Sequence, residues 1–91
     1  MKIRAHLSIE GKVKDVGFRI FMSELALSAG LTGWVMNLPD GSIEAVYEGD
    51  RNSIEDVIAK CSHGTPTARI SRVEVDWKEK PEGCTAFMIR Y

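Results

Sequence analysis

The spacing of apolar residues changes several times along this chain, and the order of these changes limits the folds that the chain can adopt. Between Lys2 and Glu10, apolar and polar residues alternate, which is the pattern of a strand with one buried face. Between Phe18 and Ala29, the apolar residues recur every three or four positions, as on one face of a helix. Gly30 predicts the end of this helix, because glycine readily takes the left-handed backbone that follows many helices.

The middle of the chain continues with strands and a second helix. Leu31–Asn37 and Ile43–Glu48 are predicted strands, and Pro39–Gly41 has the composition of a turn that joins them as a hairpin. A helix with an apolar face from Ile54 to Cys61 follows, and His63–Pro66 ends it. Three residues before this face are suitable N-caps: Asp50, Asn52 and Ser53. Asn52 and Glu55 also have the spacing of a capping box.

The last part of the chain predicts two more strands. Arg69–Lys78 has the pattern of a strand, but its apolar phase slips between Ile70 and Val73. Such a slip fits a β-bulge, in which one strand carries an extra residue. Lys80–Gly83 is a predicted turn, and Thr85–Tyr91 is a predicted final strand.

The predicted elements follow the order βαββαβ with an added C-terminal strand. Strands and helices in this order form an antiparallel or mixed sheet with both helices on one face, the ferredoxin-like or split βαβ sandwich of the α+β class. The chain has 91 residues, too few for two cores, and no linker or repeat interrupts it. We therefore expect a single domain over residues 1–91. Because many unrelated functions occur on this fold, the function has to be inferred from particular residues.

The composition argues against several classes of protein. A hydrophobic fraction of 44% with a net charge of -1 is untypical of a disordered chain. No apolar run approaches the roughly 20 residues of a membrane-spanning helix, and the N-terminus lacks the apolar block of a signal peptide. We therefore expect a cytoplasmic protein without a membrane partner. The net charge also argues against a nucleic-acid partner bound through its phosphates.

The cysteines and histidines predict neither a metal site nor a cofactor. Cys61 and Cys84 lack the spacing of metal ligands, and Cys61 falls on the apolar face of a predicted helix, where a thiol behaves as a small hydrophobic group. A disulfide and a reactive thiol are the alternatives. His6 and His63 have no evident orienting partner, so we expect no catalytic role for either.

The loop between the first strand and the first helix is the best candidate for chemistry. A loop that enters a helix directs amide N–H groups toward the helix start, and together with the positive end of the helix dipole they form an anion site. Gly17 allows the backbone to approach a ligand closely. Arg19 lies in the first turn, where the dipole opposes a cation unless Arg19 and the amides bind one anion. A solvated surface charge is the alternative for Arg19.

These features alone predict an oxyanion site and no particular ligand. The loop matches neither GxxxxGK[ST] nor GxGxxG, which disfavours binding of ATP or of a dinucleotide. The planar guanidinium of Arg19 suits phosphate better than a point charge does.

Two segments of the sequence resemble motifs of the acylphosphatase family. Gly11–Arg19 resembles the signature G-x-V-Q-G-V-G-F-R, and Gly33–Ala45 resembles the second block G-W-V-x-N-x-x-D-G-S-V-E-A. Glu48–Asp50 matches the usual start of the family's second helix. The resemblance covers essentially the whole chain, including its length and the order of its elements.

The resemblance implies hydrolysis of the carboxyl–phosphate bond of acyl phosphates to a carboxylate and inorganic phosphate, without a metal or other cofactor. In this family the arginine of the first motif holds the phosphoryl group and the asparagine of the second motif orients the attacking water; here these are Arg19 and Asn37. The loop that cradles the phosphate corresponds here to Lys14, Asp15, Val16, Gly17, Phe18 and Arg19. A small-molecule acyl phosphate is then the expected partner, and we expect a monomer.

The chain departs from the family motif at two positions. Lys14 and Asp15 stand where the family usually has Gln and Gly. Lys14 adds positive charge beside the expected anion site. A carboxylate about 5 Å from a bound phosphate would repel it by about 0.8–3 kcal/mol. Our hypothesis is that Asp15 caps the loop or helix amides and so competes with phosphate for them.

Other readings of the same residues remain open. Asn37 can be a residue that flanks the hairpin turn, and Asp40 is more typical of a turn residue than of a general base. A domain of this fold can also bind anions without turnover, or act as a regulatory amino-acid-binding module. An RNA-binding domain of this topology needs paired aromatic residues on the sheet, and the first strand has none.

Overall fold

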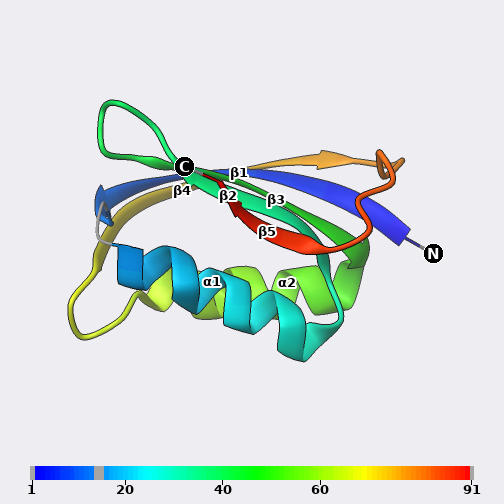
Figure 1. Ribbon diagram of the computed structural model, residues 1–91, viewed down its shortest axis with the longest axis horizontal. Helices are drawn as coiled ribbons and strands as arrows, with labels where there is room; N and C mark the ends of the chain where they lie inside the picture. The colour runs from blue at the N-terminus through cyan, green and yellow to red at the C-terminus, as the bar shows by residue number, and fades with distance from the viewer. Residues whose placement is uncertain (1, 14–15, 91) are drawn as a thin grey trace.

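The protein is a two-layer sandwich of one five-stranded sheet and two helices (Figure 1). The computed structural model describes residues 2–13 and 16–90. Both helices lie on the same face of the sheet, as the sequence predicts. The elements in chain order are β1 (Lys2–Lys12), α1 (Val16–Ala29), β2 (Thr32–Asn37), β3 (Ile43–Asp50), α2 (Arg51–His63), β4 (Arg69–Lys78) and β5 (Phe87–Arg90).

The order of strands in the sheet is β4-β1-β3-β2-β5. β1 pairs antiparallel with β3 and β4, β2 pairs antiparallel with β3, and β5 pairs parallel with β2. The first four strands therefore have the split βαβ arrangement, and β5 adds a parallel strand beside β2. The expected α+β fold with a mixed sheet and an added C-terminal strand is confirmed.

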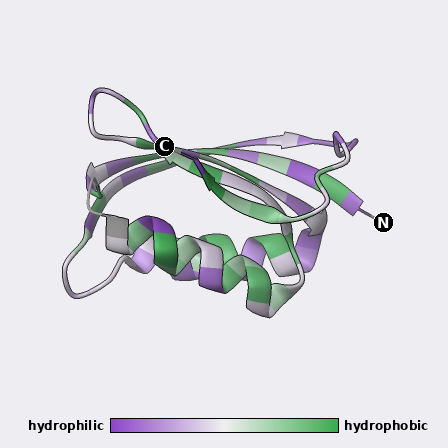
Figure 2. Ribbon diagram, viewed as in Figure 1, coloured by the Kyte–Doolittle hydropathy of each residue, from purple (hydrophilic) through white to green (hydrophobic). Residues whose placement is uncertain are grey.

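The core lies between the sheet and the helices, and Figure 2 shows hydrophobic residues in both layers. In β1 the alternation predicted from the sequence places Ala5, Leu7 and Ile9 in this core with no exposed surface. α1 contributes Phe18, Met22 and Ala26, and α2 contributes Ile54, Val57 and Cys61. Neither of these helices is long and apolar enough to cross a membrane.

The predicted bulge occurs in β4. Glu10 of β1 pairs with Arg72, whereas the next residue, Gly11, pairs with Ile70. Ser71 is thus an extra residue on β4, which explains the slip of the apolar phase between Ile70 and Val73. Gly11 has a φ of 141°, and a Cβ at this position would collide with the backbone of Arg69.

The two helices differ in how well the sequence predicted their ends. α1 begins at Val16, two residues earlier than expected, and closes at Gly30 with a φ of 70° and a bond from the Leu31 amide to the Ala26 carbonyl. The capping box predicted for α2 is wrong. The helix starts at Arg51, so Asn52 lies inside it, and Glu55 pairs with Arg51 at 3.2 Å.

The final strand begins two residues later than predicted. Among the described residues β5 contains Phe87–Arg90, the predicted last residue Tyr91 lies outside them, and residues 79–86 form an irregular connection from β4. The Gly33 amide donates a hydrogen bond of 3.0 Å to the carbonyl of Ala86, which is where the chain joins the edge of β2. β5 then runs along β2 from Gly33 to Met36.

Candidate active site

The two sequence motifs meet at one end of the sheet. β1 leads into Val13 at the start of the candidate phosphate loop, and β2 ends at Asn37. The Asn37 side-chain amide, Nδ2, lies 3.4 Å from the carbonyl oxygen of Val13 and donates a hydrogen bond to it. This contact fixes the end of β2 against the loop although the residues are 24 positions apart.

Asn37 also presents a buried acceptor at this end of the sheet. Its side-chain oxygen, Oδ1, is buried, and no described residue donates a hydrogen bond to it. Leaving a buried acceptor unsatisfied costs about 1–3 kcal/mol, so such an atom is expected to meet a donor that binds there. A water molecule has the O–H groups to serve as that donor.

Arg19 reaches the same end of the sheet from α1. Its guanidinium nitrogen Nη1 donates a hydrogen bond to the carbonyl oxygen of Arg90 over 3.4 Å. Arg90 lies opposite Met36 in the parallel pairing of β5 with β2, and Met36 directly precedes Asn37. The side chains of Arg19 and Asn37 therefore converge on the end of β2. A bond of 3.4 Å is longer than the usual 2.7–3.2 Å and is readily exchanged for a stronger partner.

The start of α1 adds positive electrostatic potential to this place. The first four amides of an α-helix have no partner within the helix, and the helix dipole is positive at this end. α1 begins at Val16 and has no acidic residue in its first turn. Phe18 is buried in the core, so its side chain anchors the helix start while its backbone belongs to the first turn. Gly17 is exposed.

Part of the expected phosphate loop is not described. Lys14 and Asp15 lie outside the described residues, so their expected contacts with phosphate, and the competition expected from Asp15, stay predictions. The described part of the loop consists of Val13 before these residues and the start of α1 after them.

Asp40 has the turn role expected from the sequence. Its carboxylate oxygen Oδ1 accepts hydrogen bonds from the backbone amide of Ser42 at 2.9 Å and from the Ser42 hydroxyl at 2.6 Å. These two bonds hold the pKa of Asp40 below its ordinary value. A carboxylate tied to the turn in this way is a poor general base, because it binds protons weakly.

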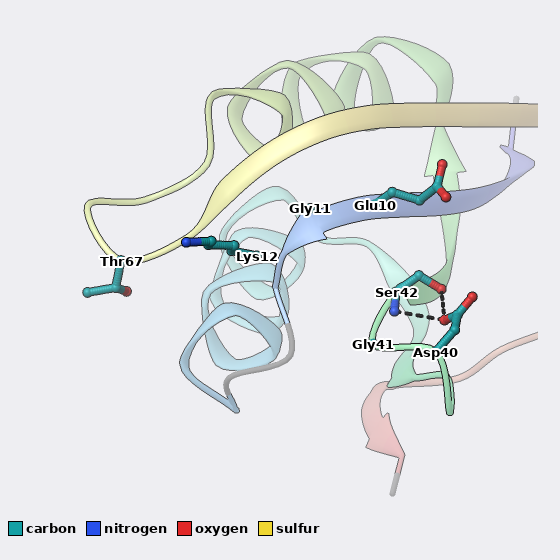
Figure 3. A pocket seen from close by; sticks show the side chains of 7 residues that line it. All are labelled: Glu10, Gly11, Lys12, Asp40, Gly41, Ser42 and Thr67. Atoms are coloured by element: carbon teal, nitrogen blue, oxygen red, sulfur yellow. Dashed lines mark hydrogen bonds between the residues drawn. The ribbon is translucent and has the colours of Figure 1, made fainter.

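A cavity of about 530 Å³ lies beside the turn that contains Asp40 and Ser42 (Figure 3). Figure 3 shows Lys12 and Thr67 on one side of the cavity and Glu10, Ser42 and Asp40 on the other. Neither Arg19 nor Asn37 lines it. Its lining carries charges of both signs and so shows no preference for an anion.

His6 and Cys61 have contacts elsewhere in the fold, away from the end of β2. His6 contacts Glu44 at 2.7 Å in the middle of the sheet. Cys61 is a free, fully buried thiol, and burial raises its pKa to about 11, as befits the small hydrophobic group predicted from the sequence. Cys84 is also free. Within residues 2–13 and 16–90, no three His, Cys, Asp or Glu side chains are grouped to hold a metal ion.

Sequence reasoning missed two features of this site. It predicted the final strand but gave no sign that β5 pairs with β2, which brings the carbonyl of Arg90 to Arg19. It also did not predict the contact between Asn37 and the Val13 carbonyl. Both contacts use backbone carbonyls, which every residue has, so no residue type in the sequence could mark them.

The guanidinium of Arg19 and the side-chain amide of Asn37 lie beside a helix start on a ferredoxin-like sandwich. Such a site suits a small phosphohydrolase. Comparison with known proteins gives the family. The sequence profile described as Acylphosphatase matches residues 5–89. The chain belongs to the acylphosphatase family, and the expectation that it is an enzyme that hydrolyses acyl phosphates is confirmed.

Individual relatives agree in sequence and in structure. An acylphosphatase of Thermococcus kodakarensis is 51% identical over 88 residues, which cover 97% of this chain and 96% of that protein. The crystal structure of acylphosphatase from Bacillus subtilis superposes with a TM-score of 0.94 at 30% identity, covering 98% of this chain and 99% of that one. An acylphosphatase structure from Coxiella burnetii gives a TM-score of 0.90 at 34% identity, covering 98% and 93% of the two chains.

Proposed function

We propose that Arg19 holds the phosphoryl group of the acyl phosphate and that Asn37 orients the attacking water. The observation that carries this proposal is the buried Oδ1 of Asn37, which lacks a donor among the described residues at the end of β2 that Arg19 also approaches. A carbonyl oxygen that accepts one O–H of a water leaves a lone pair of that water free to attack.

The chemistry requires little beyond positioning. Water attacks phosphorus, the bond between phosphorus and the acyl oxygen breaks, and the carboxylate leaves with the electron pair of that bond, while the water's proton passes to solvent. Because a carboxylic acid has a pKa near 4, the leaving group needs no general acid at neutral pH. The guanidinium of Arg19 and the amides at the start of α1 would stabilise the charge on the phosphoryl oxygens.

The remaining loop residues have proposed roles that rest on the sequence alone. Lys14, Asp15, Val16, Gly17 and Phe18 would surround the phosphate with Arg19. Lys14 would attract the anion, and Asp15 would compete with it for amide groups. Replacing Asp15→Gly is then expected to tighten phosphate binding and to lower the free energy of unfolding. Equal phosphate affinity in the two proteins would contradict the competition.

We also propose a cytoplasmic monomer that works without a metal or cofactor. The guanidinium of Arg19 and the helix start supply positive charge that a metal ion would otherwise supply. The outer strand β4 exposes charged side chains at every second position: Arg72, Glu74 and Asp76. Charged side chains at a sheet edge disfavour pairing with a second chain. Unchanged activity in EDTA and a monomer mass by light scattering are the expected results.

Hydrolysis of benzoyl phosphate, followed by its ultraviolet absorbance, tests the proposed roles. Arg19→Ala and Asn37→Ala are each expected to lower kcat/KM by about 100-fold or more, the effect of removing a group that positions or stabilises a transition state. Asn52→Ala is the matched control, because Asn52 is an exposed amide on α2. Wild-type activity in either site variant would contradict the assignment. Phosphate binding without turnover in the wild type would instead indicate an anion-binding domain.

A further inference from the structure

Glu48 is a buried carboxylate that the proposed reaction does not use. It lies on the central strand β3, opposite Arg4 of β1, and its side chain is only 3% exposed. Its oxygens accept hydrogen bonds from Nη1 of Arg4 at 2.7 Å and from the backbone amides of Glu82 at 2.6 Å and Cys84 at 2.9 Å. A buried charge is costly unless it is paired and hydrogen-bonded, and Glu48 meets both conditions.

The two amides belong to a crossover loop, residues 79–86, that joins the opposite edges of the sheet. β4 and β5 are the outermost strands, so four strand spacings of about 4.8 Å put them about 19 Å apart. The nine Cα steps from Lys78 to Phe87 can reach roughly 30 Å at full extension. Figure 1 shows the crossover loop passing across one end of the sheet, where Glu48 on the middle strand can hold it halfway.

Few other contacts hold the crossover loop. It contains no helix or strand, and most of its residues are exposed. Beyond Glu48, its contacts include the hydrogen bond from the Gly33 amide to the Ala86 carbonyl, a 3.5 Å ion pair of Arg4 with Glu82, and an interaction of Arg4 with the Cys84 thiol. The carboxylate of Glu48 is therefore the main anchor of the loop within the described part of the chain.

The crossover loop leads directly to β5 and through it to Arg19. β5 is a four-residue edge strand, held by its pairing with β2 and by Phe87, whose ring stacks on Tyr47 with a centroid distance of 5.3 Å. At its far end the Arg90 carbonyl accepts the hydrogen bond from Arg19. Short edge strands with few partners open easily, so their register depends on what precedes them.

We propose that Glu48 is a positioning residue: it anchors the crossover loop, which keeps β5 in register with β2 so that the Arg90 carbonyl aims the guanidinium of Arg19 at the phosphoryl site. This inference rests on the proposed role of Arg19. If Arg19 is correctly aimed only part of the time, the apparent dissociation constant of the phosphoryl ligand rises by the inverse of that fraction. Bound substrate restores the correct orientation, so kcat changes little. A loss of folded protein would instead lower the apparent kcat and leave KM unchanged.

The test compares Glu48→Gln with Glu44→Gln. Glutamine keeps the shape of Glu48, but its NH₂ group cannot accept the hydrogen bonds that the second carboxylate oxygen accepts. Glu44 is a matched control on β3, bonded to His6 and without a hydrogen bond or ion pair to residues 79–86. Benzoyl phosphate kinetics, the inhibition constant of inorganic phosphate, and amide hydrogen exchange are measured on both variants and on the wild type.

Glu48→Gln is expected to raise KM and the phosphate inhibition constant together by about threefold or more, with kcat within about twofold of the wild type. Amides of residues 82–90 should exchange faster, and those of β1 should not. Glu44→Gln should change none of these values. Unchanged constants with faster loop exchange would overturn the coupling to Arg19, and unchanged loop exchange would overturn the anchoring.

A second variant and a binding measurement separate a failure of this proposal from misfolding and from a failure of the proposed function. If Glu48→Gln does not fold, Glu48→Asp keeps the charge beside Arg4 but draws the carboxylate back from the amides of Glu82 and Cys84, and it is expected to shift the same values in the same direction; unchanged values would overturn the proposal. If the wild type does not hydrolyse benzoyl phosphate, the proposed function fails, while the dissociation constant of inorganic phosphate still measures whether Glu48 acts on the site. Alkylation of Cys84 is a second measure of loop opening. The rate constant at high pH, where the thiol is fully ionised, should rise in Glu48→Gln, while buried Cys61 stays protected.

Discussion

At the scale of single residues, Arg19 has a charge that its own helix opposes. A cation in the first turn of an exposed helix costs about 0.3–1 kcal/mol, because the helix dipole is positive there. Its guanidinium nitrogen Nη1 donates a long hydrogen bond of 3.4 Å to the Arg90 carbonyl. A bound phosphoryl group would convert the same charge into a favourable one. This gain is what the proposed role of Arg19 in holding the phosphoryl group predicts.

Arg19→Lys tests whether the shape of the guanidinium matters or only its charge. Lysine keeps the charge but loses the planar fork that can contact two phosphoryl oxygens. We expect kcat/KM for benzoyl phosphate to fall by about 10- to 100-fold, with the free energy of unfolding in urea unchanged within about 0.5 kcal/mol. Activity close to that of the wild type would show that a point charge is enough.

At the scale of elements, local pattern predicted most of the fold. The period of two in β1 and the period of 3.6 in α1 follow from which faces pack against the core, so the sequence shows them directly. The bulge at Ser71 was predicted for the same reason, because an extra residue shifts the apolar phase. The candidate pair Arg19 and Asn37 was recognised by its motifs, and the structure brings both to the end of β2.

Contacts between distant elements were harder to predict. Nothing in Thr85–Tyr91 indicates a parallel partner, and the pairing of β5 with β2 depends on the course of the crossover loop. The amides of Glu82 and Cys84 in that loop donate hydrogen bonds to Glu48, which looks like an ordinary strand-end carboxylate in the sequence. For the start of α2 the sequence left three caps open, Asp50, Asn52 and Ser53, and the structure shows that Asp50 is the N-cap.

Two glycines, Gly30 after α1 and Gly33 in β2, allow the cost of backbone strain to be compared with the cost of a steric collision. In Gly30→Ala the added Cβ has no atom within 4 Å, but the residue must keep a φ of 70°. We therefore expect the free energy of unfolding to fall by about 1–2 kcal/mol. Gly33→Ala would place a Cβ against the carbonyl of Val46 within the sheet, at a φ of 137°, so a larger loss is expected. Urea unfolding of both variants measures this order. Equal losses would mean that the sheet relaxes around the new methyl group.

At the scale of the whole molecule, Glu48 links folding stability to pH. Burial alone would raise its pKa, but hydrogen bonds from the Glu82 amide, Arg4 and the Cys84 amide together hold it below the ordinary 4.5. A lowered pKa adds stability that is present above pH 4.5 and is lost as the pH falls through the lower folded value.

Acid unfolding of Glu48→Gln measures this link. We expect the variant to be less stable than the wild type at pH 7, because the charged hydrogen bonds are gone. As the pH falls below about 4.5 and through the lowered pKa of folded Glu48, the wild type should lose more stability than the variant, so the two curves approach each other. Urea unfolding at several pH values gives both curves. Parallel curves would show that the carboxylate of Glu48 titrates alike in the folded and unfolded chains.

In the proposed mechanism, Arg19 and Asn37 direct water to phosphorus and not to the acyl carbon. Hydrolysis of benzoyl phosphate in water enriched in oxygen-18, with mass spectrometry of both products, distinguishes these two sites of attack. We predict that the enzymatic reaction places the label in inorganic phosphate and leaves benzoate unlabelled, because the phosphorus–oxygen bond breaks. Label in benzoate would show attack at the carbonyl carbon and would contradict the roles assigned to both residues.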